Sequence, residues 1–145
     1  MKNILISCGP IPGKLDSVKY VTNRFKGGLA FKTAEMLSHD FNVTIIKWKY
    51  TEINTNLNTI EIDNVDEYYE YVKNNKYDTY ILAGAVSNLI PVDPWKEKFP
   101  SHSYKENDEI NIKFKISPRI IDIVKKFHPR STLIGYKLLD GSKKE

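Results

Sequence analysis

The sequence predicts an α/β fold, a three-layer Rossmann-like sandwich with a mostly parallel central sheet. Almost continuous apolar runs at residues 3–7, 41–48 and 78–84 are typical of parallel strands that are covered on both faces. Segments with the apolar spacing of helices lie between such runs. Because crossovers between parallel strands are right-handed, helices on both faces of one sheet are the simplest assembly.

The first half of the chain is expected to form a strand–helix–strand unit. Residues 3–7 are the first strand, and residues 41–48 are the second. Between them, residues 27–38 are predicted to be a helix that ends at His39 and Asp40. Its apolar face is expected to consist of Leu29, Ala30, Ala34 and Leu37.

A second strand–helix–strand unit is predicted to follow. Residues 59–62 are a short strand, Asn64 is the expected N-cap of a helix over residues 65–72, and residues 78–84 are the next strand. Three prolines, at positions 91, 94 and 100, exclude a regular element from the connection over residues 85–107, which we interpret as a lid-like loop.

The last part of the chain is expected to add two strands and a helix. Residues 108–115 alternate apolar and polar side chains, which is typical of a half-exposed strand. Ser117 as N-cap and Pro118 at the first helical position predict a helix up to Phe127. Residues 131–136 are the final strand, so residues 1–140 form one predicted domain and residues 141–145 a tail.

Composition narrows the class of protein. The 145 residues include one cysteine, Cys8, which cannot form an internal disulfide, so a reducing compartment is expected. The sequence indicates neither a signal peptide nor a membrane span. We therefore expect a cytoplasmic protein with no membrane partner. The net charge of +4 is spread along the chain among acidic residues, which favours an anionic small ligand over nucleic acid.

The segment over residues 16–24 is the strongest indication of a ligand site. It is a long, polar connection between the first strand and the first helix, where open α/β sheets bind phosphate groups. A standard dinucleotide site is disfavoured because two prolines interrupt the sequence Gly9-Pro10-Ile11-Pro12-Gly13 and remove amide donors. The pair Tyr69 and Lys73 has the spacing of a short-chain dehydrogenase pair, but it falls on a polar helix face and is interpreted as a coincidence.

Three sequence blocks carry a more specific signal. They are Asp16-Ser17-Val18-Lys19-Tyr20-Val21-Thr22-Asn23-Arg24 followed by Gly27, then Ala83-Gly84-Ala85-Val86-Ser87-Asn88, then Leu133-Ile134-Gly135-Tyr136-Lys137-Leu138. In this order they resemble the motifs of phosphopantothenoylcysteine synthetase, the phosphopantothenate-cysteine ligase of coenzyme A biosynthesis, in a short or diverged form. That family carries Asp-Pro-Val-Arg-Tyr-Ile-Thr-Asn-Arg-Ser-Ser-Gly in the first block and Ala-Ala-Ala-Val-Ala-Asp in the second.

The resemblance implies a ligase that activates the carboxylate of 4′-phosphopantothenate with CTP or ATP and Mg²⁺, and then joins it to cysteine. It also implies the possibility of a homodimer. No metal site made by protein side chains alone is expected, because the three histidines lack ligand spacing. The alternative is a diverged, non-catalytic module of the same fold that binds a nucleotide or a phosphorylated metabolite.

The resemblance also assigns roles to individual residues. Asn23 and Lys105 are the implied catalytic residues: Asn23 donates its amide to the substrate carboxylate, and Lys105 lies where the family has a flexible-loop lysine. The implied substrate-binding residues are Asp16, Lys19, Tyr20, Arg24 and Gly27. The implied nucleotide-binding residues are Gly9, Ala83, Gly84, Ala85, Asn88, Tyr136 and Lys137.

Structural alternatives remain open for several of these residues. Ligand contact is the preferred role of Asn23 and capping of the following helix is its alternative, whereas the small residues at 83–85 are equally suited to helix packing. Lys19 replaces the family's arginine and offers a point charge in place of a bidentate fork. Phe25 and Lys26 replace the family's Ser-Ser, and Asn88 replaces its aspartate.

Overall fold

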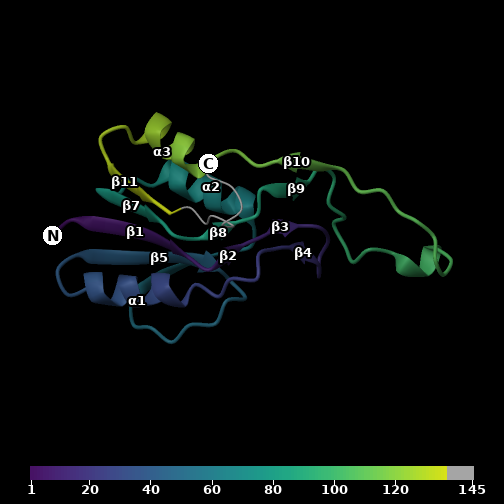
Figure 1. Cartoon of the computed structure of the whole chain (residues 1–145), viewed down its shortest axis with the longest axis horizontal. Helices are drawn as coiled ribbons and strands as arrows, with labels where there is room; N and C mark the ends of the chain where they lie inside the picture. Colours follow the sequence, from purple (N-terminus) through teal and green to yellow (C-terminus); the bar gives the residue numbers. More distant parts are fainter. Residues whose placement is uncertain (137–145) are drawn as a thin grey trace, which may run out of the picture.

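The centre of the molecule is a five-stranded parallel sheet with the order β11-β7-β1-β5-β6. The computed structural model describes residues 1–136. The sheet strands are β1 (Asn3–Cys8), β5 (Asn42–Trp48), β6 (Asn58–Ile62), β7 (Thr79–Leu82) and β11 (Thr132–Gly135). The predicted mostly parallel sheet is therefore confirmed (Figure 1).

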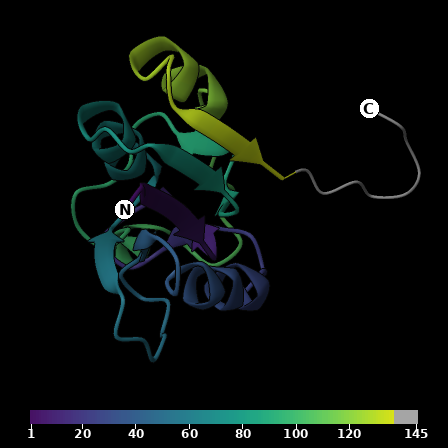
Figure 2. The same cartoon turned by 90° about the vertical axis from the view of Figure 1, so that its left-hand side faces the viewer.

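Helices cover both faces of this sheet and complete the three predicted layers. Helix α1 (Gly28–Leu37) lies on one face, and α2 (Val65–Asn74) and α3 (Ile120–Phe127) lie on the other, as the end-on view shows (Figure 2). The N-cap prediction for α2 is confirmed, because the Asn64 side chain accepts a hydrogen bond from the Glu67 amide at 3.1 Å.

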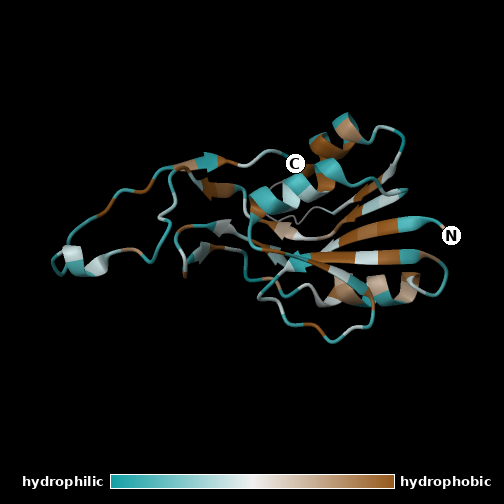
Figure 3. Ribbon diagram, turned by 180° about the vertical axis from the view of Figure 1, so that it is seen from behind, coloured by the Kyte–Doolittle hydropathy of each residue, from teal (hydrophilic) through white to brown (hydrophobic). Residues whose placement is uncertain are grey.

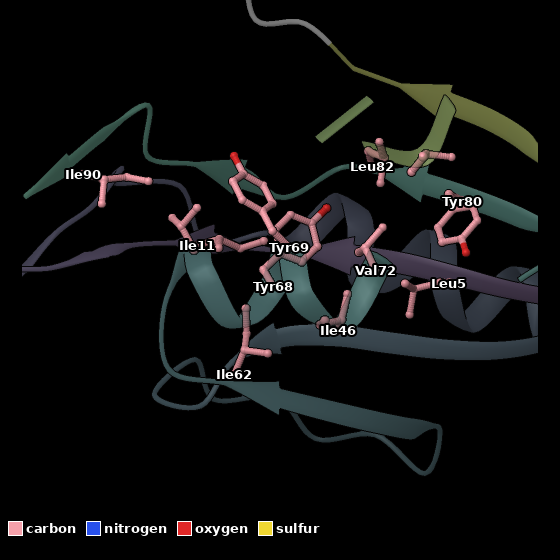
Figure 4. Packing of buried hydrophobic residues seen from close by; sticks show 12 residues of the cluster. Leu5, Ile11, Ile46, Ile62, Tyr68, Tyr69, Val72, Tyr80, Leu82 and Ile90 are labelled. Carbon is pink, nitrogen blue, oxygen red and sulfur yellow. The ribbon is translucent and has the colours of Figure 1, made fainter. Parts of the chain in front are cut away.

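The core consists of two apolar clusters, one on each side of the sheet. On β1, Leu5 packs with the α2 and α3 side, whereas Ile4 and Ile6 pack with the α1 side. This alternation follows from the two-residue repeat of a strand, and burial on both faces explains the continuous apolar run. Figure 3 shows the apolar residues along β1 and β5, and Figure 4 shows the cluster on the α2 side, including Tyr68, Tyr69 and Tyr80.

Short strands extend the molecule beyond the carboxyl ends of the sheet. They are β2 (Pro10–Ile11), β3 (Gly13–Lys14), β4 (Tyr20–Val21), β8 (Ala85–Val86), β9 (Leu89–Pro91) and β10 (Phe114–Ile116). They form the two-stranded pairs β2–β8, β3–β4 and β9–β10. Residues 92–113, here called the arm, connect β9 to β10, carry the short 3₁₀ helix η1 (Ser101–Ser103), and project away from the sheet (Figure 1).

Two predictions for this region are wrong. Residues 85–107 do contain regular elements, because β8, β9 and η1 lie within them. The predicted strand over residues 108–115 is reduced to β10, since only Phe114, Lys115 and Ile116 pair with β9. The partner strand is three residues long, so it leaves the alternating residues upstream without a ladder.

The predicted start of the last helix is also wrong. Helix α3 has Arg119 as its N-cap and begins at Ile120, although Ser117 and Pro118 form a strong sequence signal. Tertiary contacts hold these two residues outside the helix: the Ser117 amide donates to the Asn88 carbonyl at 3.0 Å, and the Pro118 carbonyl accepts from the Tyr69 hydroxyl.

On α1, the expected apolar face is correct for Ala30 and Ala34, which are buried, but wrong for Leu29, which is 77% exposed. Leu29 points away from the buried face that Ala30 and Ala34 share, and it lines the cavity described below. Among residues 1–136, no helix is both long and apolar enough to cross a membrane.

Candidate functional site

The main cavity lies where the strand order reverses direction. From β1 the chain moves to β5 and β6 on one side, and it later returns to β7 and β11 on the other. In open α/β sheets, ligands bind beyond the carboxyl ends of the strands at this switch point. A cavity of about 970 Å³ occupies this place, between the end of β1, the start of α1 and the loop after β7.

Eight of the predicted site residues line this cavity although they come from distant parts of the sequence. They are Gly9, Asn23, Gly27, Ala83, Gly84, Ala85, Asn88 and Tyr136. The structure thus brings together the three sequence blocks that carried the prediction. Their chemical roles are not tested by this arrangement.

Gly27 allows α1 to begin against the end of β1. It is the N-cap of α1 and has φ +79°, a left-handed conformation that side chains other than glycine's disfavour. A Cβ on Gly27 would lie 2.4 Å from the nitrogen of Gly9 and 2.6 Å from its Cα. The close approach of two backbones therefore requires glycine at this corner of the cavity.

The loop after β7 is held by a buried hydrogen-bond chain. The Ser7 hydroxyl accepts from the Gly84 amide at 3.2 Å and from the Tyr68 hydroxyl at 3.0 Å. A Cβ on Gly84 would lie 2.8 Å from Cδ1 of Ile11, so a larger residue does not fit there without a shift. The small size of Gly84 is thus explained by close packing against β1 and β2, which differs from the helix packing considered as the alternative.

Asn23 is oriented by a contact across the cavity wall. Its Nδ2 donates to the carbonyl oxygen of Ala85 at 3.0 Å. The N-cap of α1 is Gly27, so Asn23 does not have the alternative role of helix cap. Because an amide nitrogen carries two hydrogens, one donor remains for another partner.

The cavity is suited to an anion. Among the described residues that line it, Lys26 is the only charged side chain, and no carboxylate is present. The first turn of α1, which opens at the cavity, also carries no acidic residue. Oxygen ligands for Mg²⁺ are therefore scarce in the protein wall, and residues 1–136 contain no group of three or more His, Cys, Asp or Glu side chains placed to hold a metal ion.

Asp16 and Lys19 do not line the cavity. The Asp16 side chain is fully buried and accepts hydrogen bonds from the amides of Val18, Lys19 and Phe99 and from Lys19 Nζ. Burial favours the neutral acid, but these donors prevail and hold the pKa of the Asp16 carboxyl well below its usual range. Asp16 is thus ionised and fully engaged within the protein.

Tyr20 does not line the cavity either, because its side chain is bound to Asp63. Its hydroxyl donates to Asp63 at 2.6 Å, and Lys14 and Lys49 place their Nζ atoms 2.9 and 3.0 Å from the same carboxylate. Burial opposes ionisation of Asp63, but the hydrogen bonds from Tyr20, Lys14 and Lys49 lower its pKa below the usual range. The Tyr20 ring packs edge-on against Trp48 with centroids 5.1 Å apart. Tyr20 therefore anchors β4 to the ends of β5 and β6.

The remaining predicted residues lie away from the cavity or outside the described part of the chain. Arg24 is exposed and does not line the cavity. Lys105 follows η1 on the projecting arm and does not line it either (Figure 1). Lys137 lies outside residues 1–136. For all three, the predicted roles remain predictions.

Several lining residues were not predicted, notably Phe25, Lys26, Leu29 and Thr33. Phe25 and Lys26 replace the family's Ser-Ser, and this replacement was a signal that could have identified them. Leu29 and Thr33 lie one helical turn apart on α1, and no feature of the sequence distinguished them from residues of an ordinary amphipathic helix.

The strand order defines a Rossmann-like α/β domain with a cavity at the switch point. A family model described as the DNA/pantothenate metabolism flavoprotein C-terminal domain matches residues 1–144. The chain belongs to this family, which confirms the resemblance drawn from the three sequence blocks.

Curated relatives share this region of similarity. The Coenzyme A biosynthesis bifunctional protein CoaBC of Thermococcus kodakarensis is 29% identical over 149 residues, covering 99% of this chain and 36% of the relative. The protein of the same name from Vibrio vulnificus is 27% identical over 124 residues, covering 83% of this chain and 30% of the relative. The chain thus spans about a third of the length of these relatives.

Solved structures show the same fold. The DNA/pantothenate metabolism flavoprotein from Streptococcus pneumoniae superposes with a TM-score of 0.70 at 30% identity, covering 95% of this chain and 68% of that one. A Cab2 mutant in complex with phosphopantothenate-cysteine has a TM-score of 0.70 at 14% identity, covering 91% of this chain and 62% of that one. At that identity, the second likeness concerns the fold alone.

Proposed function

We propose that this chain carries a phosphopantothenate-cysteine ligase site in the switch-point cavity. The observation that supports this most directly is the convergence of Asn23, Gly27 and the 83–88 loop on one cavity without a carboxylate among its described lining residues. Family membership and relatives named for coenzyme A biosynthesis favour the same reaction.

The proposed reaction has two steps. A carboxylate oxygen of 4′-phosphopantothenate attacks the α-phosphorus of CTP or ATP, the bond to the β-phosphate breaks, and pyrophosphate leaves. The cysteine amine then attacks the activated carbonyl carbon, loses a proton, and displaces the nucleoside monophosphate. Both steps bring negatively charged oxygens together, so the site must supply hydrogen-bond donors and positive charge.

Asn23 is proposed to supply one of these donors. Its contact with Ala85 holds the amide plane, so the second hydrogen on Nδ2 points in a defined direction before the ligand arrives. Such an orientation lowers the reorganisation needed when charge develops on the carboxylate.

The phosphate groups are proposed to lie at the start of α1. The backbone amides there follow Gly27 and have no side-chain cap, and Lys26 adds a positive charge beside them. Because the described lining residues include no carboxylate, Mg²⁺ is proposed to enter with the nucleotide, held by its phosphate oxygens.

The test measures ligand binding and turnover on the same protein. Thermal shift is recorded with CTP, ATP and 4′-phosphopantothenate, with and without Mg²⁺, and pyrophosphate release is followed after all substrates are combined. The proposal predicts stabilisation by a nucleotide and pyrophosphate release that requires 4′-phosphopantothenate. Stabilisation by a nucleotide without turnover would contradict it and favour the non-catalytic module.

A variant pair tests the role of Asn23. Asn23→Asp places a carboxylate against the substrate's own and is expected to abolish pyrophosphate release while the fold is preserved. The control, Asn58→Asp, makes the same chemical change at the start of β6, which is not among the residues that line the cavity. Equal turnover in the two variants would refute the role assigned to Asn23.

A further inference from the structure

The carboxylate of Asp16 divides its contacts between two parts of the chain. Its Oδ1 accepts the amides of Val18 and Lys19 at 2.8 and 2.6 Å, which closes a local turn. Its Oδ2 accepts Lys19 Nζ at 3.1 Å and the amide of Phe99 at 2.7 Å. Phe99 belongs to the arm and is 83 residues away in the sequence, so one oxygen serves the local turn and the other makes the contact with the arm.

Backbone contacts on either side support this connection. The Trp95 amide donates to the Leu15 carbonyl at 3.0 Å, and the Ser17 amide donates to the Glu97 carbonyl at 3.4 Å. On the arm, the Phe99 ring packs edge-on with Trp95 at 4.8 Å between centroids and stacks on Tyr104 at 5.3 Å. The base of the arm, residues 95–99, is therefore held against residues 15–17 by backbone hydrogen bonds and is itself ordered by aromatic packing.

Residues 16–24, here called the ligand loop, are held by side chains at three points. Asp16 binds the arm, Tyr20 binds Asp63, and Asn23 binds Ala85 at the cavity. Between the first two points the loop is open to solvent, and Val18 is 58% exposed. The β3–β4 pairing and the packing of Tyr20 on Trp48 hold the centre of the loop, so its two ends depend on the hydrogen bonds of Asp16 and Asn23.

We propose that Asp16 is a positioning residue: by joining the ligand loop to the base of the arm, it holds Asn23 at the cavity. The functional part of this inference rests on the proposed ligase site, where Asn23 binds the substrate carboxylate, whereas the coupling between loop and arm does not. The sequence resemblance implied that Asp16 binds the substrate directly. In this inference Asp16 does not touch the substrate and acts only by holding Asn23 in place.

The substitution Asp16→Asn distinguishes the role of Oδ1 in the local turn from the role of Oδ2 in the contact with the arm. The new side-chain oxygen can still accept the Val18 and Lys19 amides, so the local turn survives. The new NH₂ group faces the Phe99 amide and Lys19 Nζ, and two donors cannot bond each other, so the side-chain contact with the arm is lost while the two backbone contacts remain. Losing a charge-assisted hydrogen bond shifts an equilibrium by a factor of roughly 10 to 100.

The first readout is amide hydrogen exchange in the full chain without ligand. Asp16→Asn is expected to speed exchange in residues 17–24 and 97–104 and to leave β1 and β5 unchanged. The matched control is Glu97→Gln, which removes one exposed carboxylate from the arm and leaves the Glu97 backbone carbonyl in place. Unchanged exchange in both segments of Asp16→Asn would overturn the proposal.

The second readout is the dissociation constant of 4′-phosphopantothenate, whose carboxylate Asn23 is proposed to bind, because a merely structural role would change stability alone. The comparison variant is Val72→Ala, which destabilises the core on the far side of the sheet from α1. Asp16→Asn is expected to weaken 4′-phosphopantothenate binding by roughly tenfold, within the equilibrium shift given above, whereas Val72→Ala leaves it within about twofold. Equal affinities in the two variants would overturn the positioning role.

Two further measurements distinguish failure of the positioning role from failure of the variant to fold and from failure of the proposed function. If Asp16→Asn does not fold, Phe99→Pro removes the donor amide from the arm instead. It also removes the ring that packs on Trp95 and Tyr104, so for this variant only exchange in residues 17–24 is compared, with the same expected increase. If the wild-type protein binds no 4′-phosphopantothenate, the proposed function fails, while hydrogen exchange still decides whether Asp16 couples the ligand loop to the arm.

Discussion

Replacing Gly27 by alanine tests the geometry at the start of α1. Gly27 has φ +79°, and a Cβ there would lie 2.4 Å from the nitrogen of Gly9. The left-handed conformation costs about 1–2 kcal/mol for a residue with a Cβ, and relief of the overlap adds about 1–3 kcal/mol. The expected loss is therefore about 2–5 kcal/mol, which lowers Tm by about 4–20 °C at about 2–4 °C per kcal/mol.

The adjacent glycine provides a matched control. A Cβ on Gly28 meets nothing within 4 Å, and Gly28 is the first residue of α1. Gly28→Ala is expected to be neutral or to stabilise the protein by up to about 1 kcal/mol. Urea unfolding and thermal melts of both variants provide the measurement. If Gly27→Ala were as stable as Gly28→Ala, the assigned close approach of the two backbones would be wrong.

Three further predictions concern buried polar groups. Tyr68→Phe removes the hydroxyl that bonds Ser7 and is expected to cost about 1 kcal/mol in urea unfolding; an unchanged midpoint would show that this bond adds no stability. The lowered pKa of Asp63 means that its ionised form stabilises the fold above its unfolded pKa of about 4, and this contribution is lost as the pH falls below that value. The stability difference between the wild type and Asp63→Asn should therefore be constant from about pH 7 to about pH 5 and shrink as the pH falls from about 5 to about 3, and a constant difference over the lower range would contradict the shift. Burial raises the pKa of the Cys8 thiol to about 12, so iodoacetamide should label Cys8 only in urea, and rapid native labelling would count against its burial.

Elements with strong local signals were predictable from the sequence. Continuous apolar runs predicted β1, β5 and β7, because strands covered on both faces need no polar alternation. Asn64 predicted the start of α2, because its side chain bonds an amide three residues away.

Elements that depend on distant contacts were not predictable. Ser117 and Pro118 resemble a helix start, but pairing with Asn88 and the hydroxyl of Tyr69 keep them extended. The alternation over residues 108–115 is typical of a strand, yet the length of a strand also depends on its partner, and β9 is short.

The candidate site shows the same division. The resemblance of the three sequence blocks to the family predicted residues that line the cavity, including Asn23, Gly27 and Ala85. It could not show that Asp16 bonds Phe99, 83 residues away, or that Tyr20 bonds Asp63, 43 residues away. A motif reports which residues occur together, and only the fold shows which of them face the cavity.

The proposed ligase chemistry is tested most directly by an isotope. The protein is incubated with CTP or ATP, Mg²⁺, cysteine and 4′-phosphopantothenate labelled with ¹⁸O in its carboxylate, and the nucleoside monophosphate is analysed by mass spectrometry. Attack of the carboxylate on the α-phosphorus predicts that one ¹⁸O atom is transferred to the monophosphate, because the C–O bond breaks in the second step. Unlabelled monophosphate, or none that depends on 4′-phosphopantothenate, would contradict the proposed activation of the carboxylate.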